Sequence, residues 1–298
     1  MRVTQGMLTN NMLRNLSSSY DSLGKYMEQL STGKKINRPS DDPVVAMKGM
    51  NYRTQVTNSE QFERNIGEVH NWMDNSDDAL DKTQKALERL RELAVQGANG
   101  TYEEGQRGNM AAEVDQLKEH ILDIANTEVN NKYIFNGTNT TGVDGDKPFD
   151  IDADGNFQNA INNQDVNIEV SEGTKLRVNV RPDDVFNEEL FTDLSNFAEE
   201  LRTGTDDDAI SAYIGEIDDH INNNVDTRAD LGARQNRIDL IENRVLEQGV
   251  SAKDMMSKNE DADIEKVIMN LTSQESIHRA ALSAGSRIIQ PTLLDFLR

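Results

Sequence analysis

The sequence predicts a mainly α-helical protein, in which the N- and C-terminal regions form a long antiparallel helical bundle or coiled coil that carries a small β-rich insert. Two observations support this fold class. Apolar residues recur every three or four positions in both halves of the chain, which is the spacing of one helix face. Between residues 131 and 186 this spacing disappears, and turn dipeptides such as Asn136-Gly137 and Asp154-Gly155 take its place.

The first predicted helix carries an apolar stripe typical of a helix that packs along a partner. Its residues are Leu13, Leu16, Tyr20, Leu23, Met27 and Leu30. The following segment 30–46, LSTGKKINRPSDDPVVA, predicts a joint between two helices. Gly33 suits a helix C-terminus because glycine adopts a left-handed backbone at no steric cost. Asp42 suits the cap of the next helix, with Pro43 at its first position.

Charged residues crowd this joint, and two interpretations are open. Lys34, Lys35 and Arg38 form either a phosphate-binding patch or one side of local or intersubunit salt bridges. Because Asp41 and Asp42 follow so closely, the sequence favours salt bridges.

Long helices are predicted on both sides of the insert. The first has its stripe at Ile66, Val69, Met73, Leu80, Leu87, Leu90 and Ala94, with Ser76 and Thr83 in the weaker positions, and ends near 96–100. The second has its stripe at Met110, Val114, Leu117, Ile121 and Ile124. After the insert come a short helix with Leu190, Leu194, Phe197 and Leu201 and a long one with Ile210, Ile214, Ile217, Ile221, Leu231, Ile238 and Val245.

Within the insert, a half-buried β-hairpin is the clearest element. Apolar residues alternate over 166–170 and again over 176–180, the segment SEGT separates the two runs, and Pro182 stops the second. The last helix of the chain then carries Ile264, Val267, Ile268, Leu271, Ile277, Ala281, Ala284 and Ile288, and the chain ends in the apolar tail PTLLDFLR.

We therefore expect three parts. Residues 1–42 and 264–298 form terminal coiled-coil arms, residues 43–130 and 187–263 a helical bundle domain, and residues 131–186 the β insert. The predicted assembly seam of the arms comprises Leu13, Leu16, Leu23, Met27, Leu30, Ile277, Ala281, Ala284, Ile288, Leu293, Leu294 and Phe296. Burying a Leu or Ile contributes about 1.5 to 3 kcal/mol, whereas ordering each residue costs about 1 to 2 kcal/mol. We expect the arms to be poorly ordered in the monomer and to fold when copies pack together.

The composition excludes several classes of function. The 298 residues carry a formal charge of −22, which argues against nucleic acid or an anionic membrane as partner. There is no cysteine for a disulfide or a thiolate metal site. The N-terminus lacks an apolar signal region, and no run approaches the roughly 20 apolar residues of a membrane span. A route of export without a cleaved signal peptide is therefore expected if the protein leaves the cell.

Catalysis and cofactor binding have weak signals. Segment 150–156, DIDADGN, begins like a calcium loop, but position 12 is Ile161 where a glutamate is needed. His70 with Asp74, and Glu216 with His220, share a helix face as zinc pairs do, yet such surface pairs are common. Nucleophile, phosphate-loop and metalloprotease motifs are missing from the sequence. We expect no enzyme activity, cofactor, metal or small-molecule substrate, with a secreted helical enzyme or metal-binding protein as the alternative.

Two segments resemble the bacterial flagellin superfamily. The stripe of the first helix, running into LSTGKKINRPSDDP, is similar to the N-terminal region of that family, with its "LS-x-G-x-x-I-N" joint and paired aspartates. The segment 226–245, DTRADLGARQNRIDLIENRV, resembles the family helix with an "R-x-x-L-G-A-x-Q-N-R" run. The matching residues are Arg228, Leu231, Gly232, Ala233, Gln235, Asn236 and Arg237. PSDDP and the ending SRIIQPTLLDFLR look more like the hook-associated protein 3 branch than flagellin proper.

The resemblance implies a structural role in the flagellum. Terminal arms would form the inner coiled-coil layer of a tube, the joint at residues 33–43 would lead to the next layer, and the insert would face outward. The protein would form a ring of its own copies between a hook-associated adaptor and flagellin. It would leave the cell unfolded, after a cytosolic export chaperone has held residues 264–298. Flagellin itself is the alternative within the family.

Overall fold

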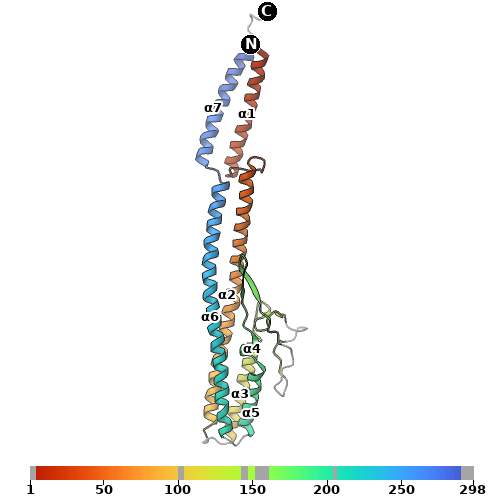
Figure 1. Cartoon of the computed structure of the whole chain (residues 1–298), viewed down its shortest axis with the longest axis vertical. Coiled ribbons are helices and arrows are strands. Elements are labelled where there is room, and N and C mark those ends of the chain that lie inside the picture. Colours follow the sequence, from red (N-terminus) through yellow and green to blue (C-terminus); the bar gives the residue numbers. More distant parts are fainter. Residues whose placement is uncertain (1–4, 100–103, 142–146, 152–160, 204–206, 290–298) are drawn as a thin grey trace, which may run out of the picture. The chain divides into compact units, whose positions relative to one another are not determined.

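The structure is a computed structural model of the chain, and it describes residues 5–99, 104–141, 147–151, 161–203 and 207–289. Within these ranges the elements are α1 (Gln5–Thr32), α2 (Pro43–Gly97), α3 (Glu104–Ala125), β1 (Glu128–Val129), β2 (Lys132–Tyr133), β3 (Asn167–Ser171), β4 (Thr174–Arg177), α4 (Pro182–Val185), α5 (Glu188–Thr203), α6 (Asp207–Glu260) and α7 (Ile264–Ile289) (Figure 1). Long helices dominate and the strands form two-stranded sheets, so the predicted fold class is confirmed.

The chain divides into two compact units, which we call the terminal unit (Met1–Asn58 with Glu247–Arg298) and the central unit (Ser59–Leu246). Their boundaries fall inside α2 and α6, whereas the sequence placed the arms within 1–42 and 264–298. α2 begins directly after the joint, at Pro43, and runs without a break to Gly97. A single helix therefore belongs to both units. The buried residues of the insert belong to the same hydrophobic core as the helices of the central unit.

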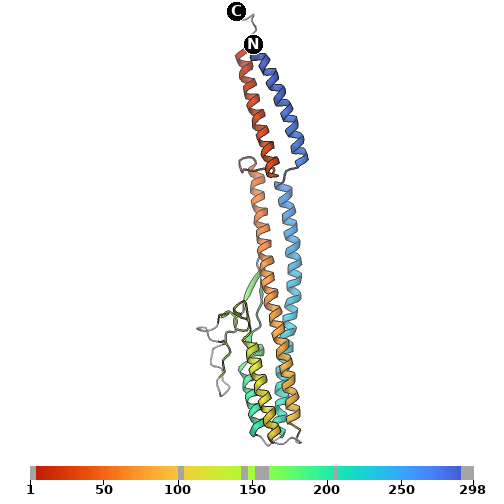
Figure 2. The same cartoon turned by 180° about the vertical axis from the view of Figure 1, so that it is seen from behind.

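In the terminal unit, α1 and α7 lie side by side and antiparallel, as both views show (Figures 1 and 2). Ser19 bonds Gln274, and Lys34 pairs with Asp261 at the other end of the two helices. The predicted pairing of the first helix with the last is therefore confirmed. Among the described helices, none is both long and apolar enough to cross a membrane.

The core of the central unit is built on the stripe of α2 that the sequence predicted. Ile66, Val69, Met73, Leu80 and Leu87 have 0 or 1% of their surface exposed. Ser76 and Thr83 are also buried, and each hydroxyl donates a hydrogen bond to the carbonyl four residues earlier, so that neither polar group is left unsatisfied. α3, α5 and α6 lie beside this part of α2 (Figures 1 and 2).

The predicted hairpin is confirmed as β3 and β4. The strands pair antiparallel with Ile168 opposite Leu176, and Gly173 turns the chain with a φ of +71°. Within the insert, the Phe186 ring packs edge-on against the rings of Phe135 and Phe149 at centroid distances of 4.9 and 6.0 Å. All three rings are buried, and they belong to the hydrophobic core that the insert shares with the helices of the central unit.

Candidate assembly surface

The contact between α1 and α7 uses a line of residues next to the predicted stripe. Ser19 is buried and its hydroxyl accepts a hydrogen bond of 3.1 Å from the Gln274 amide. Met12 packs against Gly285, where an added Cβ would lie 1.5 Å from the Met12 Cε atom. Gly285 therefore makes room for a large side chain that no other residue type would admit without a shift.

Much of the predicted assembly seam is exposed in the single chain. Leu13, Tyr20 and Met27 have 52, 69 and 61% of their surface exposed. They are seven residues apart, so they form one line along α1. We call these three residues the exposed stripe. α1 therefore has a buried line that contacts α7 and, next to it, an exposed apolar line that another protein chain can contact.

The other predicted seam residues divide between the two environments. Leu16 and Leu23 of α1 and Ala281 of α7 are half-buried, whereas Leu30, Ile277 and Ala284 are exposed. The exposed seam residues therefore do not form the contact between the two arms of one chain, and the role of the seam in assembly stays a prediction. Ile288 lies in α7, and Leu293, Leu294 and Phe296 lie outside the described residues.

The joint folds as the sequence predicts. Gly33 ends α1 with a φ of +68°, and its N–H donates to the Gln29 carbonyl. One Asp42 carboxylate oxygen accepts hydrogen bonds from the N–H groups of Val44 and Val45 at 3.0 and 3.1 Å, which caps the N-terminus of α2. Both predicted helix boundaries are therefore confirmed. The Asp41 carboxylate accepts hydrogen bonds from N–H groups of the joint itself, including that of Arg38.

Main-chain bonds tie the joint to the segment between α6 and α7. The Lys35 N–H donates to the Glu260 carbonyl at 2.6 Å, and the Ala262 N–H donates to the Gly33 carbonyl at 2.9 Å. The chain thus leaves α1 and enters α7 through one small antiparallel bridge, Lys34 opposite Asp261. This bridge holds both helix ends in register.

The salt bridges at the joint lie within the chain, but the partners of Lys34 are distant in sequence and differ from the aspartates that the sequence suggested. Lys34 Nζ lies 2.6 Å from Asp261 Oδ1 and 3.6 Å from Glu260 Oε2, whereas Asp41 and Asp42 bond main-chain N–H groups. The hydrogen bond to Asp261 raises the pKa of Lys34. In turn, Lys34 and then Ser257 lower the pKa of Asp261. Lys35 and Arg38 remain exposed.

Glu260 is the residue of the joint that the sequence did not single out. Only 3% of its surface is exposed, and its carboxylate accepts a hydrogen bond of 2.7 Å from Arg53. It fits because Gly49 on α2 has no side chain: a Cβ there would lie 2.4 Å from Glu260 Oε1. A glycine and a glutamate more than 200 positions apart give no local pattern, so only the folded chain reveals the pair.

The segment 226–245 lies on α6, and its motif residues serve contacts inside the central unit. Arg228 bonds Asp77 and Asp81 of α2 at 3.0 Å each, Leu231 is fully buried, and Gln235 donates to Asp74. The remaining motif residues lie on the outer side of the helix, with Ala233, Asn236 and Arg237 exposed and Gly232 half-buried. The motif therefore joins α6 to α2 on one face and leaves the other open.

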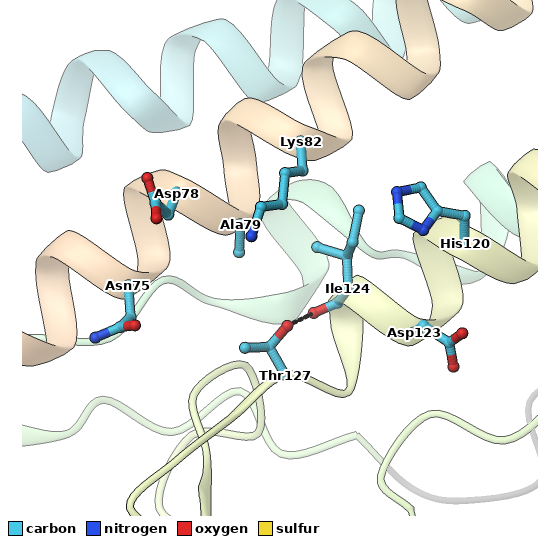
Figure 3. A pocket seen from close by; sticks show the side chains of 8 residues that line it. All are labelled: Asn75, Asp78, Ala79, Lys82, His120, Asp123, Ile124 and Thr127. Atoms are coloured by element: carbon cyan, nitrogen blue, oxygen red, sulfur yellow. Dashed lines mark hydrogen bonds between the residues drawn. The ribbon is translucent and has the colours of Figure 1, made fainter.

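The histidines and the pockets offer no converging catalytic set among the described residues. His220 Nε2 lies 2.9 Å from Asp193, and burial, followed by the charge of Asp193, raises the pKa of Glu216. His120 lines a pocket of about 230 Å³ between α2 and α3, in which the Asp123 carboxylate points away from the His120 ring (Figure 3). The remaining residues of that pocket are Asn75, Asp78, Ala79, Lys82, Ile124 and Thr127. Most of the predicted calcium-like loop lies outside the described residues.

Comparison with known proteins identifies the family. The model of the bacterial flagellin N-terminal helical region matches residues 3–140, and that of the bacterial flagellin C-terminal helical region matches residues 214–297. Together these matches cover well over half of the chain. The chain belongs to the bacterial flagellin family. The joint and the α6 motif both lie inside the matched regions of this flagellin-family chain, whereas most of the insert and α5 lie between them.

Full-length relatives come from more than one branch of the flagellin family. Flagellin of Bacillus subtilis strain 168 is 28% identical over 315 aligned positions, which cover 100% of each chain. Flagellar hook-associated protein 3 of Escherichia coli K12 is 23% identical and covers 94% of this chain and 96% of its own. The crystal structure of flagellar hook-associated protein 3 from Legionella pneumophila shares the fold, with a TM-score of 0.63 over 70% of this chain and 98% of that one at 15% identity.

Proposed function

We propose that the protein is a structural subunit of the bacterial flagellum that forms the junction between hook and filament and catalyses no reaction. The exposed stripe of α1 carries this proposal. Leu13, Tyr20 and Met27 remain open to solvent although α7 lies against the same helix. Burying an apolar side chain of this size contributes about 1.5 to 3 kcal/mol, so contact with neighbouring subunits is the favoured use of the stripe.

Two features favour the junction over the filament. The joint reads PSDDP at residues 39–43, and the chain ends in SRIIQPTLLDFLR, both of which resemble the hook-associated protein 3 branch. Hook-associated protein 3 of Escherichia coli also aligns over almost its whole length. The second candidate function is flagellin itself, and the full-length similarity to the flagellin of Bacillus subtilis favours it.

The proposed partners are the hook-associated adaptor on one side, flagellin on the other and further copies of this chain in a ring. Before export, a cytosolic chaperone would cover the C-terminal arm, residues 264–298. The side chains of Ile264, Ile268 and Met269 support chaperone binding to this arm, because these apolar groups would otherwise be exposed to solvent in the cytosol. We place the assembled protein outside the cell, exported without a cleaved signal peptide.

The joint would lead the chain from the inner layer of the tube to the next layer. Its bridge between Lys34 and Asp261 and its buried Glu260 support this role, since they hold the ends of α1 and α7 together while α2 and α6 continue beyond them. Exposed Lys35 and Arg38 are then free to meet acidic side chains of a neighbouring subunit.

A single cysteine tests the proposal, because the natural chain has none. Glu172 is exposed in the turn between β3 and β4, so Glu172→Cys offers one site for a maleimide dye. On intact flagellated cells of the protein's own bacterium, we expect one labelled zone beside each hook. Label along the entire filament would support flagellin instead, and label confined to the cell body would refute both candidates. Polymerisation of the purified protein alone into long filaments would likewise favour flagellin.

A further inference from the structure

Three potential metal ligands meet on the surface of the central unit. His70 projects from α2, and Asp239 and Glu242 project from neighbouring turns of α6. The His70 Nε2 atom lies 3.3 Å from Glu242 Oε2 and 3.8 Å from Asp239 Oδ1, and the three ligand atoms all lie within 4.8 Å of one another. We propose that this cluster binds one divalent transition-metal ion, with Zn²⁺ the best fit. The proposal is independent of the flagellar role.

The spacing of the three atoms suits a small ion. Zinc binds histidine nitrogen and carboxylate oxygen at about 2.0 to 2.2 Å, and two ligands at a tetrahedral angle are then about 3.3 to 3.6 Å apart. The two distances from His70, 3.3 and 3.8 Å, need a shift of only a few tenths of an ångström. The two carboxylate oxygens lie within 4.8 Å of each other, so they must approach by no more than about 1.5 Å. Side-chain rotation alone supplies such a shift, so the backbone can stay in place.

Both helices are held firmly under the cluster. Val69 and Met73 flank His70 on α2, Ile238 and Ile241 lie beside the two acidic residues on α6, and all four are buried. Gln235 also donates to Asp74 nearby, which ties the same two helices together a second time. Ligands on packed helices keep their positions better than ligands on loops, so binding requires little reordering.

Charge and ligand type favour a transition metal over the common hard cations. The two carboxylates balance the charge of one divalent ion, with His70 as a neutral ligand. An imidazole nitrogen suits zinc, copper or nickel, whereas calcium and magnesium prefer sites made of oxygen alone. The cluster is partly exposed, so water can complete the coordination and the ion can enter.

From the sequence, the residue that shares a helix face with His70 is Asp74, one turn further along, and we expected no metal there. In the folded chain, α6 supplies the two carboxylates and Asp74 instead accepts the Gln235 amide. A metal ion bound here would join α2 to α6 and stabilise the central unit through ligands on both helices.

Titration of the tag-free, full-length protein with Zn²⁺ tests the proposal, with isothermal calorimetry as the readout and Ca²⁺ and Mg²⁺ as comparison ions. We expect one strong zinc equivalent per chain, and we expect His70→Ala and Glu242→Gln each to weaken it at least about tenfold. His120→Ala removes an exposed histidine away from the cluster and should leave binding unchanged. Circular dichroism checks that each variant is folded.

Thermal unfolding provides a second readout, because an ion that binds only the folded state raises the unfolding temperature. Zinc should raise this temperature for the natural protein and the His120→Ala variant but not for His70→Ala. Zinc binding that survives His70→Ala at full strength, or that falls equally with His120→Ala, would overturn the assignment and leave the cluster as an ion pair between helices.

Discussion

Gly49 tests the packing of the joint with the addition of one methyl group. The residue is buried on α2, and an added Cβ would lie 2.4 Å from Glu260 Oε1. Contacts this short do not occur, so Gly49→Ala must displace the Glu260 carboxylate. Displacement breaks the 2.7 Å hydrogen bond from Arg53 to Glu260. We predict that Gly49→Ala destabilises the joint although alanine is the better helix former.

The magnitude follows from two opposed terms. Replacing a helix-interior glycine with alanine contributes about 1 kcal/mol of stability. Loss of a hydrogen bond between charged groups costs about 1.5 to 3 kcal/mol when the groups are buried. The Arg53 side chain is 63% exposed, so water can replace Glu260 as its hydrogen-bond partner. The free-energy cost therefore approaches about 3 kcal/mol only if the displaced Glu260 carboxylate stays buried. The expected net loss for Gly49→Ala is about 1 kcal/mol.

Hydrogen exchange of the Lys35 and Ala262 amides measures this loss where it occurs, since both N–H groups form the bridge at the joint. A loss of 1 kcal/mol corresponds to roughly fivefold faster exchange through local opening. In a Glu260→Ala background, the same Gly49→Ala change should become stabilising, because the clash is gone. Gly67→Ala, at an exposed site of α2 in the central unit with open space around it, is the control and should leave exchange of these two amides unchanged in either background. Failure of the sign to reverse would refute the proposed contact.

Three further predictions concern single side chains. Asp42→Ala removes the cap of α2 and should cost about 0.5 to 2 kcal/mol, seen as faster amide exchange at the start of that helix. Because the pKa of Asp261 is lowered in the folded state, its pair with Lys34 stabilises the fold above the unfolded pKa of aspartate, and this stability is lost as pH falls through the folded pKa of Asp261. Because the pKa of Lys34 is raised, the same stability is present below the unfolded pKa of lysine and is lost as pH rises through the folded pKa of Lys34. Exchange of the bridge amides, corrected for intrinsic rates, should therefore be slowest between these limits, and a flat profile in acid would contradict the assignment. Arg228→Ala should lower the urea midpoint of the central unit, reported by Trp72 fluorescence, more than Arg237→Ala does, whereas equal effects would mean that the pairs with Asp77 and Asp81 contribute nothing.

Helix positions and joint boundaries could be predicted from local sequence. The stripe that begins at Ile66 gave the buried face of α2, and Gly33 with Asp42 gave the ends of two helices, because periodicity and capping act within a few residues. The hairpin around Gly173 was predictable for the same reason. Each of these features depends on neighbours in the chain.

Contacts between distant segments could not be predicted in this way. The first helix has two adjacent lines of residues that could face α7, and the sequence favours the more apolar one through Leu13 and Met27. The structure uses the line with Met12 and Ser19, because Gly285 admits the first and Gln274 bonds the second. Such complementarity depends on a partner more than 250 positions away, which periodicity does not encode.

Incorporation of a charged variant into flagella tests most directly whether the exposed stripe is an assembly surface. Leu13→Asp with Met27→Asp places two charges on the stripe, and Asn15→Asp, at an exposed polar position of α1, adds one charge on a different face of the helix. Each variant would carry the dye at Glu172→Cys and be viewed on intact cells. We predict monomer circular dichroism like that of the natural protein in both cases, with labelled junctions lost only for the stripe variant. Labelled junctions of normal number and brightness in the stripe variant would contradict the account.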